Sequence, residues 1–413
     1  MNAAGVIFAL TPSTNPIATL NYKCLLALMT RNAIVISPHP AAKDCSREAA
    51  QRLADAAEAA GAPSGAIQIL EEPSIPLVEA FMTSEKTNVI LATGGTAMVR
   101  AAYSSSNPAI GVGPGNAPVF VDASADIAKA AQRIVASKSF DNSILCTNES
   151  VLITLPEAEG QLRRALKSAG AHICDEDAVE RLRRFLFHPR GFNIEAIGRD
   201  ATWIAQECGI RVDQSTRILV APITQIGVEE QLSREKLCPV LAMHVAKTPA
   251  QALAQARAVL RLTGAGHSAA IHTGDEAMVL AYGEAVEAYR VVVNAPCSQG
   301  AAGFGTNLAP SFTIGTGYYG RSAIGENIGP QHLVQWTRLA YPSDDDVPFG
   351  HYHGRARPFR GALPPAPEDG VVGAPRSSVA VAPAPSAASS LDRATKDELR
   401  RLIAEELRDL LGK

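Results

Sequence analysis

The chain carries the stretch NVILATGGTAMV at residues 88–99, in which an apolar run meets a helix-forming segment through two glycines. Residues 88–92 predict a buried strand, and residues 97–104 predict a helix. Small residues between the two would let backbone N–H groups approach a phosphate, because a helix N-terminus favours negative charge. The turn lacks the GxGxxG spacing of dinucleotide sites, so an ordinary tight turn is an equally good interpretation.

The same alternation of strand and helix extends through the first third of the chain. Residues 44–60 are rich in alanine and predict another helix. Short apolar runs that predict further strands occupy residues 5–10, 33–37, 66–70 and 109–112. Strands separated by helices of this length imply βαβ units, so we expect a parallel sheet.

A second lobe is predicted from residue 119 to about residue 340, where the alternation repeats. The predicted helices lie near residues 125–137, 157–169 and 250–262, and the predicted strands lie near 151–155, 218–221, 240–244 and 291–294. A hydrophobic content of 46% with only 5% aromatic residues is typical of α/β enzymes. We therefore predict the α/β fold class, with two lobes.

Charge and cysteine usage exclude several classes of protein. The formal net charge of −3 gives no indication of binding to nucleic acid or to an anionic membrane surface. The seven cysteines contain no CxxC pair and no His/Cys cluster, which argues against a disulfide framework and a metal site. The N-terminus lacks the basic region of a signal peptide, and no apolar run reaches the roughly 18 residues of a membrane span. We expect a soluble, cytoplasmic protein.

The composition changes sharply after Tyr341. Residues 342–389 are dominated by Pro, Ala, Gly and Ser, which predicts a flexible linker because such a segment buries too little apolar surface to offset chain ordering. Leucine and isoleucine then recur at three- and four-residue spacing between Leu391 and Leu411, and Thr395 with Glu398 has capping-box spacing. This pattern predicts an amphipathic helix that docks either on a partner or on the chain's own domain.

Cys146 is the residue with the clearest chemical potential. It lies in the run SFDNSILCTNES, residues 139–150, where small and polar residues precede an apolar strand. A thiolate attacks carbonyl carbon well and needs only modest lowering of its pKa to do so near neutral pH. Taken alone, Cys146 is more simply interpreted as a small buried hydrophobic residue.

Seven segments between Gly5 and Tyr341 favour a chemical role for Cys146 over that of a buried hydrophobic residue. They are TPSTNP at 11–16, SPHP at 37–40, TGGTAMV at 93–99, GPGN at 113–116, the Cys146 run, EKLCPVL at 235–241 and FTIGTG at 312–317. Together they resemble the aldehyde dehydrogenase superfamily and, within it, the CoA-acylating branch of propionaldehyde and acetaldehyde dehydrogenases. The resemblance implies a Rossmann-type cofactor lobe and an α/β catalytic lobe. Family members have a long further segment before the match to Gly5, so we expect an N-terminally incomplete cofactor lobe.

The resemblance also implies roles by position. Cys146 matches the nucleophile, which would attack an aldehyde and, after hydride loss, carry a thioester. Asn15 matches the side-chain donor to the oxyanion, with the backbone N–H of Cys146 as its partner. The positions that match the site for NAD or NADP are Ser37 and Pro38 for the adenosine ribose, Thr93, Gly94, Gly95 and Thr96 for the pyrophosphate, and Glu235 for the nicotinamide ribose. Without the resemblance, Asn15 would be interpreted as an ordinary polar turn residue and Glu235 as a solvated surface carboxylate.

One difference from the hydrolytic members of the superfamily bears on whether the thioester reacts with water or with coenzyme A. Hydrolytic aldehyde dehydrogenases usually carry a glutamate before a double glycine, whereas AIGVGPGNAP at residues 109–118 contains no carboxylate. A general base typically contributes about 10²–10⁴ in rate, so we expect the thioester to wait for the thiol of coenzyme A and not for water. His267, in the loop TGAGHS at 263–268, could assist coenzyme A, but a structural hydrogen-bonded histidine is the simpler interpretation. The other cysteines show no comparable setting.

These arguments define the predicted organisation. We expect a cofactor lobe at 1–117, a catalytic lobe at 118–315, a return and oligomerisation segment at 316–341, the linker at 342–389 and the amphipathic helix at 390–413. In bacterial-microcompartment members of the family, such a helix is an encapsulation peptide. The resemblance therefore implies a homo-oligomer in a microcompartment lumen that binds shell proteins through Leu391–Leu411 and acts on propionaldehyde or acetaldehyde. A hydrolytic enzyme and a non-catalytic assembly protein remain as alternatives.

Overall fold

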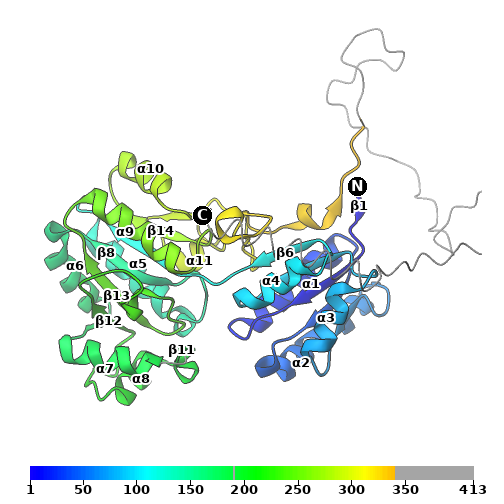
Figure 1. Cartoon of the computed structure of the whole chain (residues 1–413), viewed down its shortest axis with the longest axis horizontal. Helices are drawn as coiled ribbons and strands as arrows, with labels where there is room; N and C mark the ends of the chain where they lie inside the picture. The colour runs from blue at the N-terminus through cyan, green and yellow to red at the C-terminus, as the bar shows by residue number, and fades with distance from the viewer. Residues whose placement is uncertain (189–190, 340–413) are drawn as a thin grey trace, which may run out of the picture. The chain divides into compact units, whose positions relative to one another are not determined.

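The computed structural model describes residues 1–188 and 191–339, whose elements are labelled in Figure 1. The linker predicted at 342–389 and the helix predicted at 390–413 lie outside the described residues. Residues 1–339 form one unit that contains two parallel sheets, each described below. Within the described ranges, every helix is too short or too polar to cross a membrane.

The first sheet is built by the N-terminal third of the chain. Its strands, in sheet order, are β4 (Ile67–Ile69), β3 (Ala33–Ser37), β2 (Val6–Leu10), β5 (Val89–Thr93) and β6 (Ala109–Val112). The connecting helices are α1 (Pro16–Met29), α2 (Lys43–Ala59), α3 (Ile75–Thr83) and α4 (Thr96–Ser104). All neighbouring strands are parallel, and the chain winds outward from β2 in both directions, which is the Rossmann-type arrangement. The predicted α/β class is confirmed.

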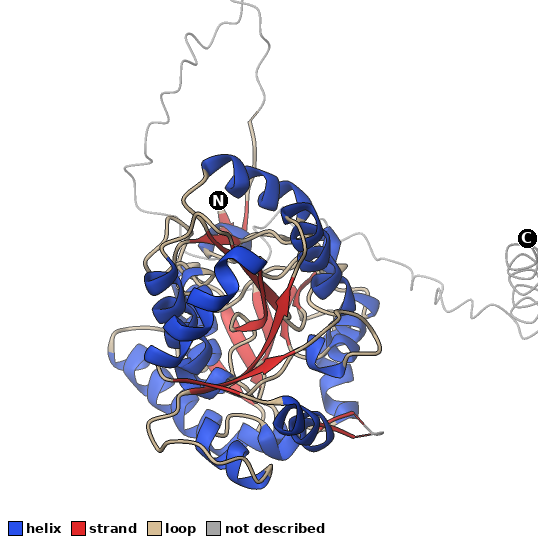
Figure 2. Ribbon diagram, turned by 90° about the vertical axis from the view of Figure 1, so that its left-hand side faces the viewer, coloured by secondary structure: helices blue, strands red, loops and turns tan. Residues whose placement is uncertain are grey.

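The second sheet is larger and also parallel throughout. Its strands, in sheet order, are β15 (Val291–Val293), β14 (Ala269–His272), β7 (Ala117–Val121), β8 (Glu149–Thr154), β13 (Val240–Val245), β12 (Ile218–Pro222) and β9 (Ala171–Ile173). Its helices are α5 (Ile127–Ser139), α6 (Pro156–Ser168), α7 (Glu176–Leu186), α8 (Ala201–Glu207), α9 (Pro249–Leu262), α10 (Glu276–Ala285) and α11 (Cys297–Gly300). Figure 2 shows helices on both faces of the strands.

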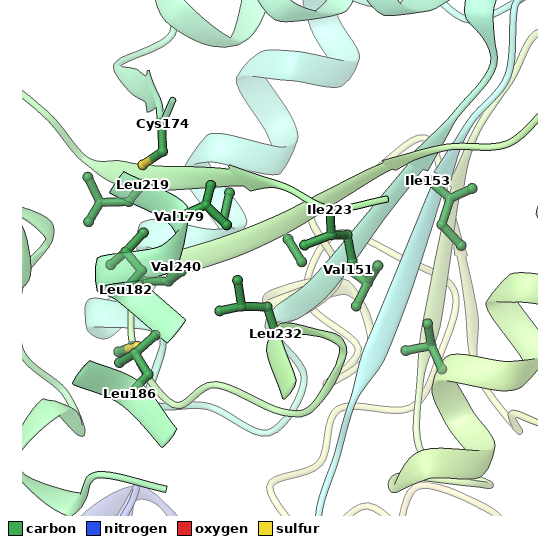
Figure 3. Packing of buried hydrophobic residues seen from close by; sticks show 14 of the residues in the cluster. Val151, Ile153, Cys174, Val179, Leu182, Leu186, Leu219, Ile223, Leu232 and Val240 are labelled. Atoms are coloured by element: carbon green, nitrogen blue, oxygen red, sulfur yellow. The ribbon is translucent and has the colours of Figure 1, made fainter. Parts of the chain in front are cut away.

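Strand β8 illustrates how this sheet buries both of its faces. Val151 and Ile153 belong to one hydrophobic cluster, whereas Leu152 belongs to the cluster on the opposite face. Successive side chains of a strand point to opposite faces, so a strand covered on both sides must be apolar throughout. Figure 3 shows the first cluster, in which Val179 and Leu182 of α7 pack toward the strands. Burying each such side chain contributes about 1.5–3 kcal/mol.

Two short antiparallel pairs complete the strands of the described residues. β1 (Asn2–Ala3) pairs with β16 (Val334–Gln335), and β10 (Phe187–His188) pairs with β11 (Gly191–Phe192). The first pair joins the beginning and the end of the described chain. Side chains of the first lobe strengthen this junction, since Asn32 Nδ2 donates to the carbonyl of Leu333 at 2.9 Å and Tyr22 Oη donates to that of Ile328 at 2.7 Å.

The residues with predicted roles lie at opposite edges of the two sheets. At the carboxyl edge of the first sheet, β2 leads into the segment that contains Asn15, and β5 ends at Thr93. At the amino edge of the second sheet, Cys146 lies shortly before β8 and Glu235 shortly before β13. In open parallel sheets the carboxyl edge is where ligands bind. The first sheet therefore offers the edge at which ligands usually bind, and the second sheet offers the thiol that is predicted to react.

Candidate active site

A single pocket collects residues from both edges. It is lined by Pro12–Asn15, His39, Thr93–Gly95 and Val112–Pro114 of the first lobe, and by Leu145–Thr147, Glu235, Leu237, Ser298, Ala302, Ser311, Phe312 and Ile314 of the second. The pocket thus brings together six of the nine predicted site residues: Cys146, Asn15, Thr93, Gly94, Gly95 and Glu235. It does not include Ser37, Pro38 or Thr96.

These three residues lie beside the pocket. Ser37 is the last residue of β3, and its carbonyl accepts the N–H of Thr11 at 3.1 Å. Pro38 follows it, and the next residue, His39, reaches the pocket instead. Thr96 begins α4 and lines an adjacent hollow with Gly113 and Pro114.

The segment before Cys146 has an unusual backbone. Asp141, Asn142 and Ser143 all have positive φ angles, of 49°, 47° and 60°. The left-handed region costs about 1–2 kcal/mol for each L-residue, so surrounding contacts must hold it. Asn142 Nδ2 donates to the carbonyl of Gly198 at 3.0 Å, and Asn148 Nδ2 donates to that of Ser137 at 2.5 Å. This strained turn fixes where the thiol projects.

The thiol of Cys146 contacts the ring of His267. The distance from His267 Nε2 to Cys146 Sγ is 3.1 Å, and His267 Nδ1 lies 3.0 Å from Ser268 Oγ. Burial raises the pKa of Cys146 to about 12 and lowers the pKa of His267 to about 3. The resting pair is therefore neutral, and the tautomer of the imidazole decides which group donates in each of these two contacts.

The sequence left the role of His267 open between a structural hydrogen-bonded histidine and a group that assists coenzyme A, and the structure places its ring against the sulfur of Cys146. The sequence held one signal of this placement, the glycines on either side of Ala265. Gly264 and Gly266 have φ angles of 85° and 78°. A Cβ on Gly266 would lie 1.8 Å from the carbonyl oxygen of Thr316, so the loop is closely packed against its neighbours.

Glu235 is the second ionisable group beside the thiol. Its Oε1 accepts the N–H of Gly115 at 3.1 Å, and burial raises the pKa of its carboxyl to about 7. After burial, the charge of Glu235 is the largest factor that raises the pKa of Cys146. Residues 109–118 contribute no carboxylate to the pocket, but Glu235, from before β13, lines it together with Cys146. It is also not a surface carboxylate.

Position 115 requires a glycine because the backbone of Cys146 packs directly against it. A Cβ at this position would lie 1.9 Å from the carbonyl oxygen of Cys146 and 3.3 Å from its Cβ. The following residue anchors the segment, since Asn116 Nδ2 donates to the carbonyls of Ser233 and Val259 at 3.0 and 2.9 Å. The thiol therefore rests against a backbone that cannot carry a side chain at this point.

Asn15 is the N-cap residue of α1, directly before Pro16. Its side chain does not cap the helix, and its Oδ1 accepts the hydroxyl of Thr14 at 2.9 Å. Because the oxygen is engaged, the amide nitrogen is the group left to donate into the pocket that Asn15 shares with Cys146. Such a donor is what the oxygen of a tetrahedral intermediate requires.

The turn after β5 fits a bound phosphate. Thr93 Oγ1 is buried without a hydrogen-bond partner in the described structure. Gly95, the N-cap residue of α4, supplies no side-chain cap, and a Cβ built on it would meet no atom within 4 Å. Free backbone N–H groups at the start of α4, an unpaired hydroxyl and open space are the features of a site for a dinucleotide pyrophosphate.

The fold and the pocket together define a class: a two-lobed α/β protein in which a Rossmann-type sheet faces a Cys–His pair on a second parallel sheet. Comparison with known proteins supports a more specific statement. The family model described as the aldehyde dehydrogenase family matches residues 1–181. The chain is 36% identical over 338 residues to the succinate-semialdehyde dehydrogenase (acetylating) of Clostridium kluyveri, covering 82% of this chain and 74% of that protein. The chain belongs to the aldehyde dehydrogenase family.

Further similarities involve longer proteins and solved structures. An aldehyde-alcohol dehydrogenase of Streptococcus pneumoniae serotype 4 is 41% identical over 345 residues, which cover 81% of this chain but only 39% of the relative. A probable aldehyde dehydrogenase from Listeria monocytogenes EGD-e superposes with a TM-score of 0.81 at 38% identity, covering 83% of this chain and 76% of that one.

Two propionaldehyde dehydrogenases are also similar. One, from the Clostridium phytofermentans fucose utilisation bacterial microcompartment, has a TM-score of 0.76 at 30% identity and covers 81% of this chain and 75% of its own. The other, from Rhodopseudomonas palustris with bound propionyl-CoA, has a TM-score of 0.75 at 30% identity. The match covers 81% of this chain and 72% of that one.

Proposed function

We propose that the chain oxidises a short aliphatic aldehyde, with NAD or NADP and coenzyme A, to an acyl-CoA by way of a thioester on Cys146. The observation that carries this proposal is the 3.1 Å contact between Nε2 of the buried His267 and Sγ of Cys146, a residue that lines the pocket in which the glycine turn also lies. The names of similar proteins agree with it, since they include an acetylating dehydrogenase and a propionaldehyde dehydrogenase with bound propionyl-CoA.

In the first half of the reaction, His267 takes the proton of the Cys146 thiol as the sulfur attacks the aldehyde carbon. The Asn15 amide and the backbone N–H of Cys146 then donate to the oxygen of the thiohemiacetal. The nicotinamide cofactor, when bound, accepts the hydride that converts this intermediate to a thioester. Thr93, Gly94 and Gly95 would hold its pyrophosphate, and Glu235 its ribose.

In the second half, the thiol of coenzyme A attacks the thioester. Burial makes His267 a weak base, as its pKa of about 3 indicates. A thiol ionises with a pKa of about 8.5, whereas that of water is about 15.7, so a weak base is far better matched to a thiol. After its first proton has passed to solvent, His267 would remove the proton of the incoming thiol and return it to the sulfur of Cys146 as the thioester bond breaks.

Glu235 gives one specific reason to test a hydrolytic alternative. Its carboxyl lies in the pocket with a pKa of about 7, so near neutral pH it is partly ionised and could activate water. A hydrolytic enzyme would release the free acid and need no coenzyme A.

One assay separates these possibilities. NADH formation from propionaldehyde is measured with and without coenzyme A, for the wild type and for Cys146→Ala. We expect turnover that depends on both coenzyme A and Cys146. Turnover without coenzyme A would favour hydrolysis, absence of turnover would favour the non-catalytic assembly protein, and activity of Cys146→Ala would overturn the proposal.

The proposed location rests on the C-terminal sequence pattern and on one microcompartment enzyme among the similar structures. We infer that residues 390–413 bind shell proteins and direct a homo-oligomer of the chain to a microcompartment lumen. A fluorescent reporter fused to these residues should collect in puncta in cells that make the shell. A diffuse signal there would reject the inference.

A further inference from the structure

Arg290 is a buried arginine that directly precedes β15, at the same sheet edge as the reactive thiol. Only 2% of the residue is exposed. Its guanidinium makes five hydrogen bonds, from Nε to the carbonyl of His267 (2.9 Å), from Nη2 to the carbonyls of Gly266 (2.9 Å) and Gly315 (2.5 Å), and from Nη1 to the carbonyl of Gly325 (2.8 Å) and Asn327 Oδ1 (3.4 Å). These bonds tie the loop that carries His267 to residues 315–327.

All five acceptors are neutral. Among the residues that the structure describes, no carboxylate forms an ion pair with Arg290. Burial of a charge without a counter-charge is unfavourable, so an arginine in this position needs a compensating function. Burial lowers the pKa of Arg290 to about 10, and the guanidinium therefore stays charged at neutral pH.

A single residue links Arg290 to the thiol of Cys146, because His267, whose carbonyl accepts from the guanidinium, contacts the sulfur with its ring. Its positive field opposes the rise in the pKa of Cys146 and is in turn stabilised by any negative charge on that sulfur. A charge that appears only during the reaction can supply the partner that the resting structure lacks. The same guanidinium also fixes the backbone of His267, which receives the proton.

We propose that Arg290 is a positioning residue of the Cys–His pair: it fixes the His267 loop, and its unpaired charge stabilises the thiolate of Cys146 as the proton leaves. The proposal deepens the proposed function by assigning a residue that acts through the reactive pair. It depends on the reactivity of Cys146 but not on coenzyme A or on the identity of the aldehyde.

Several groups besides Arg290 influence ionisation of the thiol, and any pH measurement reports their sum. Glu235, from before β13, disfavours the thiolate, whereas the backbone N–H of Cys146 favours it. His267 contacts the sulfur directly from the loop before β14. The thiol of Cys297, on α11, is a further neighbour that burial keeps neutral. Substitution of Arg290 leaves Glu235 and Cys297 in place but removes hydrogen bonds that hold the His267 loop, so the comparison of Arg290→Gln with Arg290→Lys separates the effect of the charge from that of the loop position.

The test measures alkylation of Cys146 in the full chain, which requires neither cofactor nor substrate. Iodoacetamide modification of the Cys146 peptide is followed by mass spectrometry in the wild type, Arg290→Gln and Arg290→Lys from pH 6 to pH 9, which lies below the pKa of Cys146 and that of Arg290. In this range the alkylation rate follows the small thiolate fraction, so we expect Arg290→Gln to react about tenfold more slowly than the wild type at each pH. Arg290→Lys keeps the charge and should recover part of the rate. Arg163→Gln, which removes a charge on α6, should match the wild type.

A parallel kinetic measurement separates positioning from general loss of structure. We expect kcat to fall tenfold or more in Arg290→Gln while KM for the cofactor stays within twofold, because the glycine turn lies in the other lobe. Thermal unfolding checks that each variant folds. If Arg290→Gln does not fold, Arg290→Lys is compared with the wild type instead. An alkylation rate equal to that of the wild type in a folded Arg290→Gln variant would overturn the inference. Full activity of Cys146→Ala would overturn the proposed function, while the alkylation result would still decide the role of Arg290.

Discussion

The two sheet edges that meet at the pocket are packed in opposite ways. At the carboxyl edge of the first sheet, Thr93 Oγ1 has no partner, and a Cβ on Gly95 would meet no atom within 4 Å. At the amino edge of the second sheet, a Cβ on Gly115 would lie 1.9 Å from the carbonyl oxygen of Cys146. Both edges use glycine, but Gly95 leaves open space beside the backbone, whereas Gly115 allows the backbone of Cys146 to pack directly against it.

This difference indicates a division of labour. Free N–H groups and an unpaired hydroxyl gain hydrogen bonds only when a ligand binds, so we expect the first edge to be completed by the proposed cofactor. Close packing around Cys146 sets the position of the thiol before any ligand binds, which matters because a displacement of about 1 Å can lower a rate about 10²-fold. Substitutions at the two edges should therefore have different signatures.

The largest effect is expected for Gly115→Ala. The added methyl overlaps the carbonyl of Cys146, so the backbone at the thiol must move. We expect kcat to fall about 10²-fold or more and the free energy of unfolding to fall by about 1–3 kcal/mol. Gly113→Ala is the matched control, because a Cβ there meets no atom within 4 Å. It should leave the alkylation rate of Cys146 unchanged, and equal loss in both variants would contradict the packing argument.

Glu235→Gln tests the buried charge at the second edge. The pKa of this carboxyl is about 7 in the folded protein and about 4.5 in the unfolded chain, so the folded state binds the proton more tightly. Its contribution is favourable below pH 4.5 and is lost as the pH rises to about 7. Glutamine stays neutral and can still accept from Gly115.

The stability gain of Glu235→Gln should therefore appear only at the higher pH. We expect about 1–3 kcal/mol more stability than the wild type at pH 8 and little difference at pH 4.5, measured by urea unfolding. Glu229→Gln, at an exposed position, controls for loss of one carboxylate. A gain of the same size at both pH values would show that burial of charge is not the cause.

The comparison also explains which features the sequence could predict. Strands β3 and β6 have the predicted bounds, because short apolar runs between helices mark buried strands. Helices α1 and α3 were not predicted. In α1, Leu25 and Met29 are exposed while Lys23 is buried, so its apolar residues form no single stripe.

The first edge could be predicted better than the second, for a geometrical reason. The glycine turn lies between one strand and the next helix, so its environment is local. His267 lies 121 residues from Cys146, and Arg290 lies 23 residues from the carbonyl it binds, so only the fold brings them together. Charged residues carry no local signal that they will be buried, which is why Glu235 was expected on the surface in isolation.

Thr93→Val tests the unpaired hydroxyl of the first edge. Valine keeps the shape of threonine and removes a hydroxyl that has no partner in the described structure. We expect unchanged or slightly higher stability and a KM for NAD or NADP that rises about 2–10-fold, the value of one hydrogen bond. Thr87→Val is the matched control, since Thr87 Oγ1 already donates to the carbonyl of Phe81 at 2.7 Å. It should lose about 1 kcal/mol of stability with no change in KM, and a reversed pattern would reject the assignment.

Gly95→Ala should have the smallest effect on the stability of the protein, and it should raise the free energy of unfolding, which Gly115→Ala lowers. Gly95 has φ of −64° and ψ of 160°, which alanine adopts without strain, and its Cβ meets no atom within 4 Å. Reduced entropy of the unfolded chain should then stabilise the fold by about 0.4–1 kcal/mol. The methyl would occupy space that a pyrophosphate needs, so KM for the cofactor should rise while the alkylation rate of Cys146 stays constant. Destabilisation by Gly95→Ala, or a slower alkylation, would show that the first edge is packed as tightly as the second.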